Sequence, residues 1–172
     1  SVCLASPLRD VYKRQHLHVA ADMVRPGDVL VVEQSGDDRS SFGGMVAFTA
    51  KTNGAVGVVL AGATNDFEEV VELGLPVYSR GVSARTTRIL GIEGSINVPV
   101  CVGGVVVEPG DAVFADSDGV AILKESEIDE VVATLRAKEG AEPDMQKKIA
   151  AGSKLSEWSG AARYFEPAGG ES

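Results

Sequence analysis

Cysteine and histidine are scarce in this chain, and their scarcity excludes several classes of protein. The only two cysteines, Cys3 and Cys101, are far too few for a disulfide framework. We therefore expect a reducing, cytoplasmic environment. The two histidines, His16 and His18, stand together, and no residue at metal-ligand spacing follows them. A Ser/His/Asp hydrolase or a phosphohistidine carrier has no support in such a sequence.

Long apolar runs and an excess of positive charge are also missing. The longest apolar stretches, such as residues 55–61, have the length of a strand, well short of the ~20 residues that span a membrane. The 16 basic residues are outnumbered by 25 acidic ones, which gives a formal charge of −9 at pH 7. A surface of this sign repels phosphate backbones and anionic lipids, so we expect neither nucleic acid nor a membrane as a partner.

The remaining composition, 44% hydrophobic and 24% charged, is typical of one globular domain. Residues 1–15 have neither the apolar core of a signal peptide nor a clear period. We interpret them as a non-native leader translated from adapter sequence, with a short native arm as the alternative. In the first case the domain lacks part of its own N-terminal portion. We expect an α/β domain over residues 16–140 and a C-terminal helix and tail over residues 141–172.

Strands and helices alternate in the first half of the domain. Residues 28–34 follow a Pro-Gly turn and predict a strand, and the continuous apolar run 55–60 predicts a strand covered on both faces. Apolar residues at helical spacing predict helices over 42–53 and 66–73, each closed by a glycine. Residues 75–79 predict another short strand. This order indicates a βαβ unit and an α/β fold.

Closely spaced strands dominate the second half of the domain. The segments INVPVCV, GVVVE, DAVFAD and VAILK are separated by short glycine-containing turns, which predict hairpins. An amphipathic helix is predicted over residues 126–137, with Ser126 and Asp129 positioned as a capping box. A last short helix is predicted near residues 145–150.

Two features are candidates for chemistry. Gly43 and Gly44 open a predicted helix, where exposed backbone N–H groups can bind a carboxylate or a phosphate. Asp66 follows an apolar strand and a turn of small residues, a position where α/β sheets place ligand-binding groups. A carboxylate there can equally be a plain helix cap. Glu69 lies one turn further on the same face, so Asp66 and Glu69 can share a hard cation such as Mg²⁺ or its waters.

An ordered series of segments resembles a known family. RPGDVLVVEQSGD, FGGMVA, GVVLAGATNDFEEVVELGLPVYSRGVS and INVPVCVGGVVVEPGDAVFADSDGVAIL closely resemble the RraA-like family. This family includes class II 4-hydroxy-4-methyl-2-oxoglutarate aldolases and oxaloacetate decarboxylases. The resemblance extends from Val24 to Leu123. It implies a layered α/β domain of the swivelling β/β/α type, assembled as a homotrimer or a hexamer with active sites at the subunit interfaces.

The resemblance also assigns a metal site. The family pattern has a glycine or an acid, twenty further residues, Arg-Asp, and an acid three residues beyond the Asp. It reads here as Gly44, Asn65, Asp66 and Glu69. By resemblance, Asp66 anchors a divalent metal, Mg²⁺ or Mn²⁺, and Glu69 contributes directly or through water. The stretch around Glu139 and Glu142 is a candidate source of a further acid from a neighbouring subunit.

The substrate's carboxylate is expected at Gly44 and at the amides of Met45 and Val46. Asn65 stands where catalytic members have an arginine that grips the 2-oxo acid and stabilises the enolate. Loss of such a donor typically costs ~3 kcal/mol, or roughly 100- to 1000-fold in rate. Arg80 and Arg85, in the neighbouring loop, are candidate replacements.

The function implied by the resemblance is that of a metal-dependent lyase. It would cleave a C–C bond in a small 2-oxo acid through a pyruvate enolate, by aldol cleavage, by oxaloacetate decarboxylation, or by both. The alternative is a non-catalytic regulator that binds an endoribonuclease or another protein, to which an acidic surface is suited. An incomplete fragment with neither activity is a third possibility.

Overall fold

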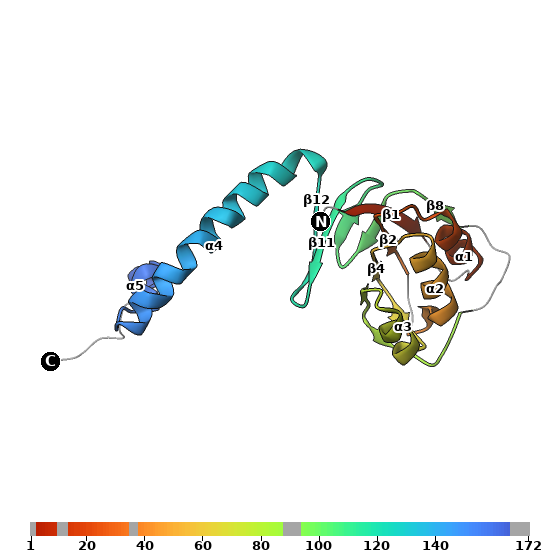
Figure 1. The fold of residues 1–172 in the computed structure, drawn as a ribbon, viewed down its shortest axis with the longest axis horizontal. Coiled ribbons are helices and arrows are strands. Elements are labelled where there is room, and N and C mark those ends of the chain that lie inside the picture. The colour runs from red at the N-terminus through yellow and green to blue at the C-terminus, as the bar shows by residue number, and fades with distance from the viewer. Residues whose placement is uncertain (1–2, 10–13, 35–37, 88–93, 166–172) are drawn as a thin grey trace. The chain divides into compact units, whose positions relative to one another are not determined.

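The computed structural model of this protein describes residues 3–9, 14–34, 38–87 and 94–165. The chain forms two compact units, Ser1–Ser126 and Glu127–Ser172. The first contains the sheets and helices α1 to α3, and the second contains α4 and α5 (Figure 1). This division differs from the boundary at residue 140 expected from the sequence, because a single helix runs unbroken across that position.

The first unit is built on a seven-stranded sheet in the order β12-β11-β1-β2-β4-β6, with β8 also paired to β1. β1, β2, β4 and β6 run parallel to one another, whereas β11 and β8 pair antiparallel with β1, and β12 pairs antiparallel with β11. The strands are β1 (Cys3–Arg9), β2 (Asp28–Val32), β4 (Gly57–Leu60), β6 (Val77–Tyr78), β8 (Ser95–Ile96), β11 (Ala112–Asp116) and β12 (Gly119–Leu123).

β1 lies inside the segment that was expected to stand outside the fold. It pairs with β2 over the register Leu4↔Asp28 to Leu8↔Val32, and with β11 on its other side. Its partners lie about 25 and about 110 positions away in the sequence, as the registers Leu4↔Asp28 and Leu4↔Ala112 show, so no local pattern marks the pairing. Residues 3–9 therefore take part in the sheet. That they are a non-native leader stays a prediction.

The two faces of the sheet carry different layers, as Figure 1 shows for the three helices. Helices α1 (Arg14–Met23), α2 (Gly44–Thr52) and α3 (Phe67–Leu73) cover one face. There, residues such as Leu17, Ala47 and Val70 pack against Leu30 and Val58 of the strands. The hairpin of β9 (Val100–Val102) and β10 (Val105–Val107) covers the other face.

On the hairpin side, Val100 and Val107 pack against Val29, Val31 and Val59. Successive residues of β2 thus enter opposite cores, and the strand is buried on both faces because both layers are present. Helices, sheet and hairpin form three layers. The expected layered α/β fold of the β/β/α type is confirmed.

A second, small sheet was not predicted. β3 (Ser40–Phe42), β5 (Ala63–Thr64) and β7 (Gly81–Val82) pair in parallel in the order β3-β5-β7. Strands of two or three residues are too short to show a hydrophobic period, so the sequence could mark them only as turns. The longer predicted elements, by contrast, correspond to β2, α2, β4, α3, β6 and the strands from β8 to β12.

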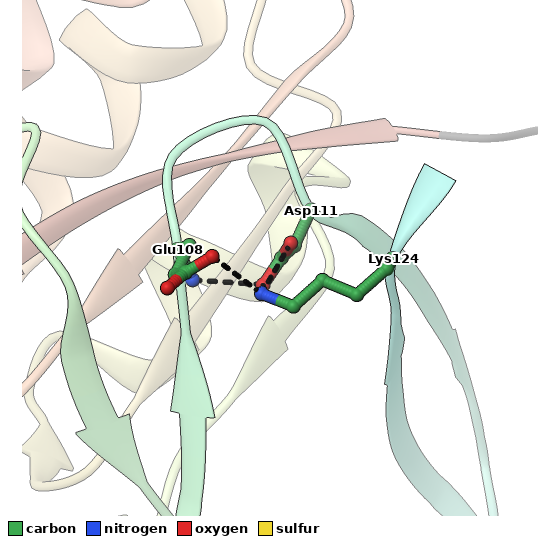
Figure 2. Close-up of polar contacts among 3 residues, drawn as sticks. All are labelled: Glu108, Asp111 and Lys124. Atoms are coloured by element: carbon green, nitrogen blue, oxygen red, sulfur yellow. Dashed lines mark hydrogen bonds and ion pairs between the residues drawn. The ribbon is translucent and has the colours of Figure 1, made fainter. Parts of the chain in front are cut away.

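The two Pro-Gly turns predicted from RPGD and EPGD have the same geometry. In the first, Asp28 N–H donates to the Arg25 carbonyl (3.0 Å), and in the second, Asp111 N–H donates to the Glu108 carbonyl (3.1 Å). The buried Asp111 carboxylate also accepts from Glu108 N–H (2.8 Å) and pairs with Lys124 Nζ (2.9 Å). Figure 2 shows Lys124, on the segment after β12, reaching both Asp111 and Glu108. These contacts fasten the turn to the end of the β11–β12 hairpin.

The second unit is mainly one long helix, α4 (Ile128–Ala150), followed by α5 (Leu155–Trp158). The expected break between helices at 126–137 and 145–150 is wrong, because α4 passes through Gly140 and Pro143. The residues between the two predicted helices are mostly strong helix formers, which that prediction underweighted. The expected capping box is also wrong, since Glu127 is the N-cap residue and makes no side-chain cap bond. In the described part of the chain, no helix is long and apolar enough to cross a membrane.

Candidate functional site

Two helix N-termini meet where the small sheet ends. α2 follows β3 through Gly43, and α3 follows β5 through Asn65 and Asp66. Because β3 and β5 are parallel neighbours, the two strand-to-helix turns leave the same edge of the sheet. Asn65 N–H donates to the Phe42 carbonyl (2.9 Å) and fixes the turns side by side. Residues about twenty positions apart are thereby brought into contact.

Asp66 connects the two helices. It occupies the N-cap position of α3 in a left-handed conformation (φ 52°) and makes no side-chain cap bond to its own helix. Its Oδ2 instead accepts a hydrogen bond from Gly44 N–H, the first amide of α2, at 2.9 Å. Asparagine and aspartate tolerate this backbone region better than most residues. The plain-cap alternative is therefore not what the geometry shows, because the carboxylate serves the neighbouring helix.

The absence of side chains at Gly43 and Gly44 makes room for the acidic cluster. A Cβ at Gly43 would lie 2.6 Å from Asn65 Nδ2 and 2.7 Å from Asp66 Oδ2, closer than real contacts allow. A Cβ at Gly44 would overlap the Glu69 carboxyl group. Glu69 and Asp66 thus both lie against the N-terminus of α2, on the common face that their i, i+3 spacing predicted. The structure brings Gly44, Asn65, Asp66 and Glu69 together.

Ser40 is a member of this cluster that the sequence did not reveal. Its side chain is buried and its Oγ donates a hydrogen bond to Asn65 Oδ1. Because the Asn65 N–H also donates to the Phe42 carbonyl, β3 orients both the backbone and the side chain of Asn65. The sequence feature that could have identified Ser40 is its position in a short segment just before the two glycines.

The first amides of α2 point toward the same region. The intrahelical ladder begins with Ala47 N–H donating to the Gly43 carbonyl (2.9 Å). The N–H groups of Gly44, Met45 and Val46 precede it and have no acceptor within the helix. The Asp66 carboxylate accepts a hydrogen bond from the first of these N–H groups. The Met45 and Val46 N–H groups contribute the remaining partial positive charge of the helix N-terminus. The Met45 side chain is exposed, whereas Val46 is buried in the core.

Comparisons with known proteins identify the family of this chain. Residues 7–122 match the family described as RraA-like, Aldolase/RraA. The chain belongs to the RraA-like family. A relative from Halalkalibacterium halodurans, provisionally named a 4-hydroxy-4-methyl-2-oxoglutarate aldolase, is 34% identical over 125 residues. That alignment covers 72% of this chain and 59% of the relative. The chain thus spans about three fifths of the length of that relative.

Solved structures of the RraA-like family are also similar. The RNA-processing inhibitor RraA from Thermus thermophilis has a TM-score of 0.67 at 30% identity, with 72% of this chain and 76% of that chain covered. Streptomyces coelicolor RraAS2, described as an unusual member of the RNase ES inhibitor RraA protein family, has a TM-score of 0.70 at 30% identity. That match covers 84% of this chain and 75% of the other.

The side chains of this RraA-like site fit a hard divalent cation better than a transition metal. Asp66 and Glu69 supply two carboxylates beside successive glycines. Among the described residues, no group of three or more His, Cys, Asp or Glu could hold a metal ion. Mg²⁺ usually takes one or two protein carboxylates and keeps several waters, whereas zinc sites need three or four protein ligands. The donor set matches the first requirement only.

The structure brings neither candidate replacement arginine to this cluster. Arg85 pairs with Asp38, Nη1 to Oδ1 at 2.6 Å, on the exposed surface. Arg80 precedes β7 and lines two cavities whose described walls do not include Asp66. Glu139 and Glu142 lie on α4, in the other unit, and their contribution to a metal site stays a prediction.

Proposed function

We propose that this chain is a divalent-metal-dependent lyase that cleaves a C–C bond in a small 2-oxo acid. The observation that carries the proposal is the convergence of Asp66 and Glu69 on the N-terminus of α2 at Gly43 and Gly44. A helix N-terminus attracts the carboxylate of a 2-oxo acid, and the two acidic side chains attract a cation. Aldolase is also the provisional name of relatives such as that from Halalkalibacterium halodurans.

Each residue has a proposed role. Asp66 and Glu69 would hold Mg²⁺ or Mn²⁺, partly through water, and the Met45 and Val46 amides would hold the substrate's carboxylate. When bound, the metal supplies Lewis-acid stabilisation of the charge that develops on the substrate's carbonyl oxygen as the pyruvate enolate forms. Asn65, oriented by Ser40, replaces a charged donor by a neutral one and predicts a slow reaction. Assembly into a homotrimer or hexamer in the cytoplasm is part of the same proposal.

The test is pyruvate release from oxaloacetate and from 4-hydroxy-4-methyl-2-oxoglutarate, with Mg²⁺ and with a chelator. Asp66→Asn keeps the side-chain volume and the tolerance for a left-handed backbone, so it removes mainly the charge. Glu68→Gln is the matched control, because Glu68 is an exposed acid in the same first turn of α3. We expect chelator-sensitive turnover that Asp66→Asn abolishes and Glu68→Gln retains. Turnover unaffected by chelator in the wild type would contradict the metal site.

A second function is favoured by Asn65 itself. A non-catalytic regulator that binds an endoribonuclease needs no arginine beside Asp66, and a chain of charge −9 suits a basic partner segment. The Thermus thermophilis neighbour is described as an RNA-processing inhibitor, and the Streptomyces coelicolor neighbour as an unusual member of an RNase inhibitor family. No turnover of either substrate by a well-folded oligomer, together with endoribonuclease binding that survives Asp66→Asn, would favour the regulator.

A further inference from the structure

A hollow region lies at the carboxyl ends of β2, β4 and β6, and its lining includes none of the residues of the acidic cluster. It consists of two cavities of about 370 Å³ and about 440 Å³ that share Ala61 and Arg80 in their walls. Neither wall includes Gly44, Asn65 or Asp66. The carboxyl edge of parallel strands is where open α/β sheets bind ligands. Cavities of this size lie within the range used for small molecules.

The smaller cavity is apolar. Val31 and Val59 of the sheet form one wall, and Val102, Val105 and Val107 of the β9–β10 hairpin form the facing one. Val105 is half exposed at 49%, although it faces other valines across the cavity. Burying such side chains against a hydrocarbon group removes apolar surface from water and is favourable.

The larger cavity is polar, and its groups are already paired except for Arg80. Gln34 donates to the Arg39 carbonyl (2.6 Å) and accepts from Ser41 Oγ (2.9 Å). Asp38 is paired with Arg85. Among the contacts of the described residues, the Arg80 guanidinium has no carboxylate or carbonyl partner. Of the two charged side chains in the described lining, Asp38 is paired with Arg85, which leaves Arg80 without a partner charge there, in a chain whose net charge is −9.

We propose that Arg80 and the valine-lined cavity form a binding site for a small branched aliphatic carboxylate. The guanidinium pairs with the carboxylate, the arrangement that its planar fork favours, and the branched hydrocarbon lies between Val59 and Val105. The site is separate from the proposed lyase centre, because it uses none of the residues around Gly44. Its ligand is a bound anion and undergoes no reaction there.

Ligand-observed NMR with isovalerate tests the site directly. Isovaleramide has the same shape without the charge, and acetate has the charge without the branched chain. We expect isovalerate to bind the full chain at least tenfold more tightly than either. A charged hydrogen-bonded pair typically contributes a factor of about ten to a hundred over isovaleramide, and burial of the branched hydrocarbon favours isovalerate over acetate. Equal binding of acetate and isovalerate would overturn the apolar half of the proposal. No binding of isovalerate at millimolar concentration would overturn all of it.

Four variants distinguish this site from the proposed lyase centre. Arg80→Gln and Val105→Asp should each weaken isovalerate binding by about tenfold or more, since they remove the cation or place a like charge beside the ligand. Arg85→Gln is the matched control, because it removes a guanidinium that is already paired with Asp38, and it should retain binding. Asp66→Asn should also retain binding. Loss in Asp66→Asn but not in Arg80→Gln would assign the anion to the proposed lyase centre and refute the proposal.

Discussion

The hydrogen bond from Gly44 to Asp66 gives a stability prediction with a worked magnitude. Asp66→Asn replaces a carboxylate acceptor by an amide oxygen at the N-terminus of α2. Hydrogen bonds to charged groups contribute about 1.5–3 kcal/mol and neutral ones about 0.5–1.5. The charge also interacts with the helix end by about 0.3–1 kcal/mol. Because Asp66 is exposed, we take the low end of both ranges, and expect a loss of about 1 kcal/mol in the free energy of unfolding.

Urea unfolding followed by circular dichroism measures this loss. Fluorescence of the single tryptophan, Trp158, is unsuitable because it reports on the second unit. Glu68→Gln removes an acid from the same turn of α3 without a bond to α2, and should change stability by less than about 0.5 kcal/mol. Equal losses in Asp66→Asn and Glu68→Gln would refute the bridge between the helices, because both would then reflect only the charge near α3.

Two further changes test the surroundings of this bond, and a third tests the ion pairs of Lys124. Gly44→Ala should displace the Glu69 carboxyl and weaken Mg²⁺ binding in calorimetry, and the same change in a Glu69→Ala background should destabilise the fold less than it does alone. Asn65→Arg should raise weak oxaloacetate decarboxylation by roughly 100-fold, because it restores a charged donor; no rise in a folded, metal-binding variant would count against the proposed geometry. Glu108 and then Asp111 raise the pKa of Lys124 through hydrogen bonds, so its stabilising contribution is present below the ordinary lysine pKa of 10.5 and lost as pH rises through the higher folded value. Lys124→Met should remove that alkaline dependence of the melting temperature.

The longer elements could be predicted because their patterns are local. The run at β4 is continuous and rich in β-branched residues, and α2 and α3 show apolar residues at helical spacing followed by a glycine. Each of these patterns can be recognised in a short stretch of sequence. β1 could not be predicted in this way. Its place between β2 and β11 depends on pairing with distant strands, and its own residues have no period.

The candidate site residues could be selected from the sequence, but their mutual geometry could not. The resemblance selected Gly44, Asn65, Asp66 and Glu69, and the structure brings these residues together. The direction of the Asp66 bond depends on the pairing of β3 with β5, strands too short to be recognised in the sequence. The same pairing brings Ser40 to Asn65, 25 residues away, which no local pattern could indicate.

The position of Asp66 also constrains how a substrate could bind. The positive end of α2 is the part of this cluster that attracts a carboxylate, and one of its three outward amides is already bonded to the Asp66 carboxylate. A 2-oxo acid bound at Met45 and Val46 would therefore lie beside an anion, with Glu69 as a second negative charge nearby. Asn65 provides no positive charge to offset them. A divalent cation between the carboxylates and the substrate would remove this repulsion, so substrate affinity itself, and not only the rate, should depend on the metal.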